Sequence, residues 1–527
     1  MATKGGNRPS KDDGSRPGVL VARNPATGEV LGEVPANSPA EAKEAVEHAR
    51  KVFPEWAAID ARGRARMLGE VRRRISELID DIVEAVSSNT GKPRAEALVH
   101  DVLPPVMQLA WLEKMAPRYL RPDRPGRLMG MLAGLSSRVE YRPFGVVGAI
   151  SPWNYPFSLG VQAVASALAA GNTAVLKPSE ATPQVGEVLK RVFEPLPAGV
   201  LTVVQGAGDV GAALVDAPCD KICFIGSPAT GRKIAEAAAK HLTPVVMELG
   251  GKDPAIVCAD ADPDHAAAGI AWGSFLNAGQ TCAAIERIYV VDQVADDFER
   301  ALTTKIGALR RGQDGDLGSL TLERQLEVVK RHVEDALGKG ARVLVGGPAG
   351  GDDGLWYAPT VLKDVNLDMA VMREETFGPV VVLTRVRDED EAVRRANEDG
   401  FNLTASVWTK DHRKGVRLAQ RIRAGAVLVN EVGAVGDGVP WMPWGGVGES
   451  GYGRINGPHG LREFTFPVHV GRKILPGKSV WWYPYDEPTT EALRATIEMF
   501  AARSWGQRLK HIPRIARGMT RAIRAKL

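Results

Sequence analysis

The sequence has few cysteines and no long apolar run. Four cysteines among 527 residues are too few for a disulfide scaffold and fit a reducing compartment, so at least one thiol is free for chemistry. No apolar stretch reaches the roughly eighteen residues that a membrane-spanning helix requires. Residues 1–18 combine charge, glycine and proline without an apolar segment, which predicts a disordered tail rather than a signal peptide. These absences predict a cytoplasmic protein that does not cross a bilayer.

The excess of basic charge lies at the end of the sequence. The net charge is +4, yet residues 499–527 hold eight Lys or Arg and no Asp or Glu, which leaves residues 1–498 at −4. A body of that charge gives no reason to expect a nucleic-acid partner. In the tail, apolar residues recur every three or four positions between arginines, which predicts a basic amphipathic helix interrupted at Pro513. Such a helix can lie on an anionic membrane surface, or pack on the protein's own body or a partner subunit.

Short apolar runs alternate with helical stretches after Gly145. The runs cover 146–150, 173–177, 201–205, 221–226 and 244–249. Repeated strand–helix units of this length predict a parallel sheet with helices on both faces, and such sheets bind ligands at the carboxyl ends of their strands. A second alternating series from Pro254 to about Asn430 predicts another α/β unit.

The segments before Gly145 have other patterns. Apolar spacing predicts surface helices over Ser38–Phe53 and Ala61–Ser88. Between Arg127 and Tyr141, a Met- and Leu-rich stretch meets a strand-like one, which is typical of a hairpin reaching away from the body.

Two positions could carry nucleophilic chemistry. Cys282 follows the glycine-containing turn Asn277–Thr281, where a backbone N–H can point at an oxygen on the attacked carbon, and a cysteine near a helix start is a better thiolate. A lone cysteine is more often a small buried hydrophobe. Glu248 ends an apolar strand directly before a Gly-Gly pair, where an apolar pocket would raise its pKa and make it a general base. The alternative for Glu248 is a solvated or salt-bridged carboxylate.

Seven motifs together resemble those of the aldehyde dehydrogenase superfamily. They are PWNYP at 152–156, KPSE at 177–180, GSPATG at 226–231, ELGGKDP at 248–254, NAGQTC at 277–282, EETFGPV at 374–380 and PWGGVGESGYGR at 443–454. They occur in the family's order, which chance does not supply. The resemblance implies a non-acylating, NAD(P)-dependent enzyme with an α/β fold: a Rossmann-like cofactor domain, an α/β catalytic domain and a small oligomerisation hairpin or strand.

The resemblance assigns catalytic roles position by position. It makes Cys282 the nucleophile, Glu248 the general base and Asn154 the side-chain donor of the oxyanion hole. The aldehyde would be oxidised through a thiohemiacetal and a thioester on Cys282, which water activated by Glu248 hydrolyses to the free acid. Family members that transfer the acyl group to coenzyme A generally lack a glutamate at the position of Glu248.

The resemblance also implies a cofactor groove. Its residues would be Ser151, Trp153, Lys177, Glu180, Gly226, Ser227, Leu249, Gly250, Glu375 and Phe377. Lys177 and Glu180 would hold the adenosine ribose. A carboxylate at position 180 repels a 2′-phosphate, so NAD is expected over NADP, although Lys177 would tolerate a phosphate. Pro228 stands where the family more often has threonine, which weakens any expected hydroxyl contact there.

Three other patterns have ordinary interpretations. Gly206–Gly211 fits a dinucleotide fingerprint, but no acidic residue follows its first glycine by about 20 positions, so we expect a turn entering a helix. Cys219 and Cys223 are spaced for one face of a helix, but residues 220–224 are strand-like, which argues against a metal or redox pair. The nine histidines have no ligand spacing, so no metal is expected.

The substrate tunnel, by resemblance, would be lined by Tyr155, Gln162, Leu276, Thr281 and Trp444. Two aromatic rings and a leucine favour an apolar aldehyde, aliphatic or aromatic, and no arginine is present among these positions to bind a carboxylate. Both rings could equally pack against neighbours and touch no substrate.

The predicted organisation has five parts. They are a tail over 1–18, an NAD-binding domain over 19–126 and 146–249, oligomerisation segments over 127–145 and 465–488, a catalytic domain over 250–464, and a basic amphipathic tail over 489–527. A homodimer or homotetramer is expected from the resemblance. Two alternatives remain open at this point: a coenzyme A-acylating semialdehyde dehydrogenase, and a non-catalytic scaffold that retains the fold.

Overall fold

The structure is a computed structural model. It describes residues 18–126, 135–347, 354–398, 400–436, 438–474, 479, 482–483 and 485–526. The predicted N-terminal tail, except Gly18, and the first part of the predicted 127–141 hairpin lie outside the described residues. The chain forms two compact units, one up to Arg121 together with 141–466, and one of 122–140 together with 467–527. Within the described ranges, no helix is both long and apolar enough to cross a membrane.

The first unit contains the predicted parallel sheet. Its six strands have the order β18-β8-β7-β4-β5-β6, and all neighbours are parallel except β18 and β8. The strands are β4 (Val146–Ile150), β5 (Thr173–Lys177), β6 (Leu201–Val203), β7 (Lys221–Ile225), β8 (Val245–Glu248) and β18 (Gly451–Tyr452). Their helices are α7 (Pro156–Ala170), α8 (Pro183–Phe193), α9 (Gly208–Asp216) and α10 (Pro228–Ala239). The uninterrupted apolar strands follow from burial on both faces, and the sequence prediction of this sheet is confirmed.

The Gly206–Gly211 pattern opens α9 directly after β6, as expected for a turn entering a helix. One strand of the first sheet was not foreseen. β18 lies within the range predicted for the catalytic domain, yet it pairs antiparallel with β8, and Gly451 lies opposite Glu248.

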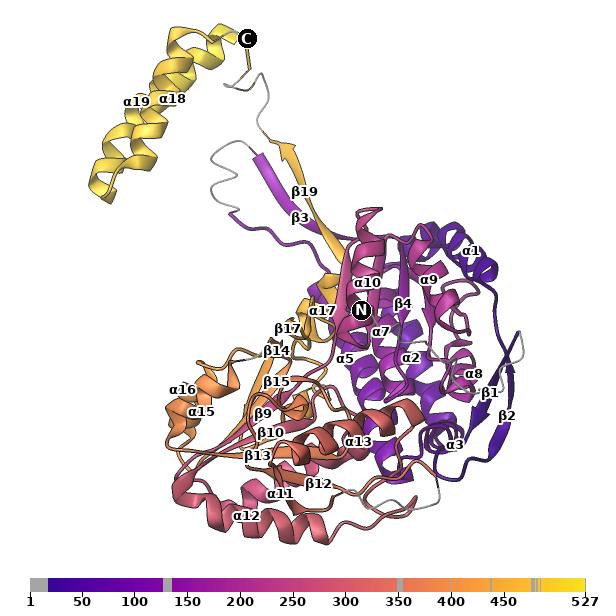
Figure 1. The fold of residues 1–527 in the computed structure, drawn as a ribbon. Helices are drawn as coiled ribbons and strands as arrows, with labels where there is room; N and C mark the ends of the chain where they lie inside the picture. The colour runs from indigo at the N-terminus through magenta and orange to yellow at the C-terminus, as the bar shows by residue number, and fades with distance from the viewer. Residues whose placement is uncertain are drawn as a thin grey trace, which may run out of the picture. The chain divides into compact units, whose positions relative to one another are not determined.

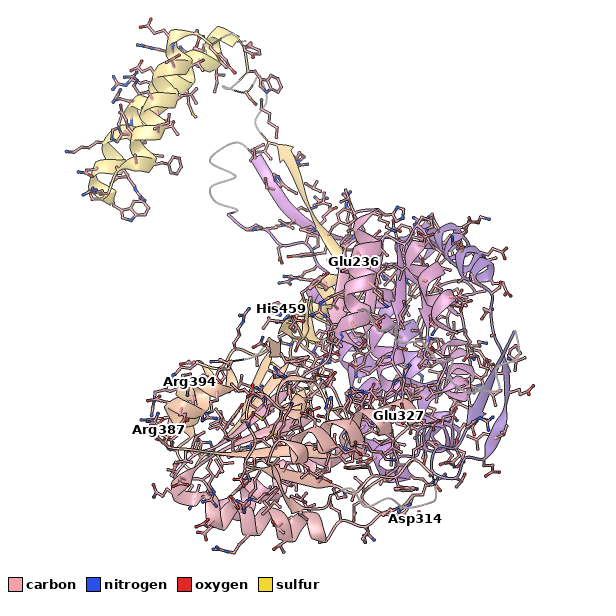
Figure 2. All side chains as sticks on the ribbon, in the orientation of Figure 1. Glu236, Asp314, Glu327, Arg387, Arg394 and His459 are labelled. Carbon is pink, nitrogen blue, oxygen red and sulfur yellow. The ribbon has the colours of Figure 1, made fainter. Side chains whose placement is uncertain are left out.

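A second sheet of seven strands lies in the same unit (Figure 1). Its order is β11-β12-β13-β10-β9-β15-β16, and only the pair β11 and β12 is antiparallel. The strands are β9 (Asp253–Val257), β10 (Ile285–Val291), β11 (Arg342–Val345), β12 (Thr360–Lys363), β13 (Val380–Val386), β15 (Thr404–Trp408) and β16 (Ala426–Val429). The helices are α11 (Pro263–Phe275), η2 (Leu276–Gly279), α12 (Asp292–Gly307), α13 (Glu323–Gly338), α14 (Ala370–Arg373), α15 (Glu389–Ala396), α16 (His412–Ala419) and η3 (Gly433–Gly436). Figure 2 shows Glu327 on α13 and Arg394 on α15 among the charged residues of this part of the chain.

The N-terminal elements surround the first sheet. Strands β1 (Val19–Arg23) and β2 (Val30–Pro35) form a hairpin, and Ser38 caps α1 (Pro39–Ala58) in a capping box with Glu41. The predicted helix over 61–88 is divided at Leu78. The elements that follow α1 are α2 (Ala61–Glu77), α3 (Ile79–Thr90), α4 (Arg94–Glu96), η1 (Ala97–Val102) and α5 (Leu103–Tyr119). The remaining elements of this unit are β14 (Phe401–Asn402), β17 (Val447–Gly448) and α17 (Gly457–Glu463).

A two-stranded ribbon belongs mostly to the second unit. β3 (Leu135–Pro143) pairs with β19 (Thr465–Lys473), so the described strand of the predicted hairpin finds its partner more than three hundred residues along the chain. On its other side, Asp123 and Val139 exchange backbone hydrogen bonds of 3.0 and 2.8 Å.

The second unit also contains a helical hairpin. The predicted interruption of the basic helix at Pro513 is wrong. α18 (Glu487–Ala501) packs along α19 (Trp505–Lys526), and α19 runs through Pro513 without a break. Proline removes one backbone donor, but packing against another helix stabilises the turns on either side. Ala492, Ala495 and Ala522 are fully buried in the hairpin, so close helix contact compensates for the lost hydrogen bond.

Candidate active site

Cys282 follows a strained turn. Asn277, Ala278 and Gly279 have φ values of 51°, 54° and 73°, all in the left-handed region. A Cβ on Gly279 would lie 2.1 Å from the carbonyl oxygen of Gly378, so only glycine fits there. The Ala284 N–H donates to Thr281 at 3.0 Å, and β10 follows at once. The expected glycine-containing turn is present, but Cys282 is in a turn before a strand and not at a helix start.

Hydrogen bonds join this turn to Asn154. The Nδ2 of Asn154 donates to the Gln280 carbonyl at 3.0 Å. The Nδ2 of Asn277 donates to the carbonyls of Asn154 and Gln280, at 3.0 and 3.1 Å. An amide nitrogen carries two hydrogens, so Asn154 retains a second donor. The loop that carries the thiol and the loop after β4 are therefore held in one arrangement.

Two cavities meet at the half-buried Cys282, which lines both of them. The first cavity, called the polar cavity below, has a volume of about 460 Å³ and walls that are about half polar. The second, called the apolar cavity, has a volume of about 350 Å³ and mainly apolar walls. The Cys282 thiol can therefore react with a molecule bound in one cavity while a second molecule is bound in the other cavity.

The polar cavity collects residues from the carboxyl ends of the first sheet. Its walls include Trp153, Asn154, Gly226, Ser227, Glu248, Gly250, Cys282, Glu375 and Phe377. Glu248, at the end of β8, is 2% exposed. Gly226 and Ser227 precede α10, with Ser227 as its N-cap and Pro228 in its first turn. The N-terminus of a helix favours phosphate groups.

Glu375 and Phe377 close this cavity. Burial, reinforced by the charge of Glu286, raises the pKa of Glu375 to about 8. Its carboxylate accepts the Gly251 N–H at 2.9 Å, and a Cβ on Gly250 would lie 2.3 Å from it. The Phe377 ring meets Trp153 edge to face at 5.5 Å. No side chain fits at Gly250, and the N-terminus of α10 lies on the wall of the same cavity. This arrangement suits a dinucleotide.

The apolar cavity is lined by four of the five predicted substrate residues. These are Tyr155, Leu276, Thr281 and Trp444, and the hydroxyls of Tyr155 and Thr281 are 2.6 Å apart. Gln162 is not on its wall. Gln162 is buried within α7, where its amide donates to Ser158 at 3.1 Å.

A sequence profile of the aldehyde dehydrogenase family matches residues 13–470. The chain belongs to the aldehyde dehydrogenase family. It is therefore an oxidoreductase that acts on aldehydes.

Curated relatives and solved structures of similar proteins agree with this assignment. A protein of Methylomonas sp. named 4,4′-diapolycopene aldehyde oxidase is 38% identical over 486 residues, which cover 91% of each chain. A Mycobacterium tuberculosis protein named as a putative succinate-semialdehyde dehydrogenase [NADP(+)] is 38% identical and covers 83% of this chain and 86% of its own. The crystal structure of a M. tuberculosis aldehyde dehydrogenase complexed with NAD+ is 34% identical, with a TM-score of 0.81, over 88% of this chain and 95% of the other.

Four of the predicted cofactor residues lie off the polar cavity of the enzyme. Ser151 and Leu249 are buried, Lys177 is the last residue of β5, and Glu180 follows that strand. The Lys177 ammonium binds the Glu180 carboxylate at 2.6 Å. Burial opposes ionisation of Glu180, but the charge and hydrogen bond of Lys177 outweigh it and lower the pKa of that carboxyl.

Other residues of the two cavities were not predicted. The polar cavity adds Arg324, Gln325, Arg331 and His332 from α13, and the apolar cavity adds Val99, His100, Leu103, Pro104, Met107, Trp272, Val439 and Trp441. Burial and the charge of Lys92 lower the pKa of His100 to about 4, so this ring stays neutral. No local motif marks these positions, because η1, α5 and the segment after β16 reach the cavity only through tertiary packing.

A buried ion pair of the enzyme also lies outside the predicted motifs. The Lys92 ammonium binds Asp101 at 2.8 Å and donates to the Asn154 carbonyl at 2.6 Å. Asp101 accepts the N–H groups of Phe157 and Ser158, at 3.1 and 3.3 Å, at the start of α7. Lys92 thus fixes the loop that presents Asn154.

One group of potential metal ligands exists among the described residues. Cys258, Asp260 and Glu389 bring their ligand atoms together. The Lys414 ammonium binds both carboxylates, at 2.5 Å for Asp260 and 2.9 Å for Glu389. A lysine at this position supplies the positive charge, so the group carries no argument for a metal.

Proposed function

We propose that this aldehyde dehydrogenase oxidises a large apolar aldehyde to the free acid, with NAD as cofactor and NADP as the alternative. The observation that carries the proposal is the position of Cys282 on the walls of both cavities. The apolar cavity is the substrate site and the polar cavity is the cofactor site.

The Cys282 thiolate attacks the aldehyde carbon and forms a thiohemiacetal. The oxyanion accepts hydrogen bonds from the second Asn154 amide hydrogen and from the Cys282 backbone N–H. Loss of one such donor typically costs about 10²–10³ in rate. A bound nicotinamide ring supplies the hydride acceptor, and a thioester on Cys282 results.

Glu248 removes a proton from the water that hydrolyses the thioester. Its burial at the end of β8 and its position on the same cavity wall as Cys282 support this role. The presence of a glutamate here favours free acid over an acyl-coenzyme A product. An intact set of Cys282, Glu248 and Asn154 argues against a non-catalytic scaffold.

The walls of the apolar cavity favour an apolar substrate. None of the described residues that line it is Lys or Arg, and His100 is neutral. Succinate semialdehyde, which the names of the mycobacterial relatives carry, has a carboxylate that would require a cation. The name of the Methylomonas relative, 4,4′-diapolycopene aldehyde oxidase, supports the apolar class instead.

The cofactor assignment rests on the polar cavity and on Glu180. The start of α10 faces the cavity and suits a pyrophosphate, and Glu375 with Phe377 suits the nicotinamide ribose and ring. Lys177 and Glu180 suit the adenosine ribose, where the Glu180 carboxylate disfavours a 2′-phosphate. One solved structure similar to the enzyme is described with NAD+ and another as an E. coli NADP-dependent enzyme, which is 34% identical with a TM-score of 0.82 over 86% of this chain.

The assembly and location are part of the same proposal. The enzyme forms a homodimer or homotetramer through segments 127–145 and 465–488, which include β3 and β19. It is a cytoplasmic enzyme that associates peripherally with an anionic membrane surface through residues 499–527, and there meets its apolar substrate. The division into an NAD-binding domain, 19–126 with 146–249, and a catalytic domain, 250–464, belongs to this proposal as well.

A panel of short, long-chain and aromatic aldehydes and semialdehydes, followed by NADH absorbance, tests the function. We expect the highest kcat/KM for long apolar aldehydes, acid formation without coenzyme A, and no NADH formation by Cys282→Ser. Parental NADH formation by Cys282→Ser would refute the thioester route. A strict requirement for coenzyme A would establish the acylating alternative, and inactivity on the entire panel would favour the scaffold.

A further inference from the structure

We infer that the α18–α19 hairpin is a docking surface for an anionic lipid bilayer, with one apolar face that enters the interface. This deepens the peripheral association proposed above and rests on it. The structure contains two helices where the sequence predicted one. It also distinguishes the side of each helix that contacts the other helix from the apolar and basic sides.

Small residues hold the two helices together. Ala492, Ala495 and Ala522 are buried, and a Cβ on Gly518 would lie 2.9 Å from Ala492. On one edge, the Glu498 carboxylate binds Arg514 at 2.8 Å. Small residues therefore occupy the contact between α18 and α19, which lie side by side (Figure 1).

The large apolar residues of the hairpin are exposed together. Ile497, Phe500, Trp505, Leu509 and Ile512 are 69, 61, 77, 57 and 48% exposed. Successive helix residues are rotated by about 100°, so Trp505, Leu509 and Ile512 share one side of α19, and Phe500 lies opposite the Glu498 edge of α18. Exposed apolar faces of this kind mark an interaction site. Figure 2 shows side chains standing off both helices.

The charge of the hairpin indicates an anionic partner. Residues 486–526 contain nine Lys or Arg against four Asp or Glu. Lys510, Arg517 and Arg521 lie about 120–160° around α19 from Trp505, on the side of the helix opposite the apolar residues. An apolar side opposite a basic side is the arrangement of a helix that lies in the interface of an anionic bilayer. With nine basic and four acidic residues the hairpin has a net charge of +5, which suits an anionic surface and disfavours a second hairpin of the same charge as the occupant.

The mouth of the apolar cavity, in the first unit, gives independent support. Leu103, Trp272 and Trp441 line this cavity and are nevertheless 49, 41 and 52% exposed. Tryptophan prefers the boundary between water and hydrocarbon. An apolar rim around the opening suits a substrate taken from a lipid phase.

Sedimentation of the full-length protein with vesicles tests the inference. The probes are phosphatidylcholine vesicles, with and without phosphatidylglycerol. The apolar variant is Phe500→Ser/Trp505→Ser/Leu509→Ser, and the matched control is Leu242→Ser/Leu367→Ser/Val416→Ser, whose leucines and valine are 90, 54 and 52% exposed in the first unit. A charge variant, Lys510→Glu/Arg517→Glu/Arg521→Glu, separates the electrostatic contribution.

We expect the parent and the control to sediment with the anionic vesicles only, and both hairpin variants to lose at least about tenfold in partitioning. A parent that stays in the supernatant, or that binds neutral vesicles equally, would overturn the inference. So would a smaller oligomer of the apolar variant in light scattering, because the face would then be a contact between copies. Oxidation of a soluble aldehyde should be the same in all four proteins, and its absence from the parent would count against the proposed function alone.

Discussion

Replacing Lys92 by methionine removes a buried cation and shortens the side chain by only one heavy atom. Lys92 and Asp101 are 1% and 0% exposed in their side chains, so solvent does not screen the pair. Removal of one partner leaves the other charge buried and unpaired, which costs about 3–5 kcal/mol. We therefore expect the free energy of unfolding, measured by urea denaturation, to fall by about that amount.

The same substitution should lower the activity. The Asn154 carbonyl loses the Lys92 donor but keeps the Asn277 amide at 3.0 Å. The loop that carries Asn154 loses one of these two hydrogen bonds and keeps the other. We therefore expect kcat to fall by about tenfold, which is less than the roughly 10²–10³ lost when an oxyanion donor is removed. The double variant Lys92→Met/Asp101→Asn should recover most of the stability, because asparagine is neutral and its oxygen still accepts the N–H groups of Phe157 and Ser158.

The pH dependence distinguishes an unpaired charge from a packing defect. Burial raises the pKa of Asp101, and Lys92 opposes that rise. Without Lys92 the folded-state pKa rises further above the unfolded value. The native variant then binds a proton that the unfolded chain does not, so its stability falls as the pH rises through that window and recovers as the pH falls. A deficit that is absent, or equal at pH 5.5 and pH 8, would refute this reasoning.

Three other substitutions test the site. Glu248→Gln should release about one equivalent of NADH per active subunit in a burst and then turn over about 10²–10⁴ more slowly, because the general base for hydrolysis is gone; stopped-flow absorbance showing an undiminished steady state would exclude that role. Glu180→Gln should raise the ratio of kcat/KM for NADP over NAD by about tenfold, since a like charge beside the 2′-phosphate is removed, and an unchanged ratio in steady-state kinetics would mean that Glu180 does not face that phosphate. Gly279→Ala, at a φ of 73° and with its Cβ 2.1 Å from a carbonyl oxygen, should lower both the calorimetric Tm and kcat; parental values for both would show that the turn can rearrange.

Much of the fold could be predicted because the first sheet is covered on both faces. The runs 146–150 and 173–177 coincide with β4 and β5, since a strand buried on both sides is apolar at every position. The antiparallel strand β18 could not be foreseen. It has only two residues, Gly451 and Tyr452, and it is a strand only because it pairs with β8, about two hundred residues earlier in the chain.

The predicted nucleophile, base and amide do lie around one cavity, although their roles remain predictions. Cys282, Glu248 and Asn154 each sit in a local motif that a strand end or a tight turn imposes on the sequence. Lys92 has no such motif. It approaches Asn154 only because η1 and α5 pack against α7, and this contact depends on the assembled core.

The sequence by itself determined the family, the parallel sheet and the turn that carries Cys282, because local periodicity and short motifs encode backbone conformation over a few residues. The tertiary structure decided which side chains share a cavity. It left Gln162 inside α7, brought Val99 and Trp441 to the apolar cavity, and carried α19 straight through Pro513. These outcomes depend on packing between segments far apart in the chain, whose free energy no single segment contains.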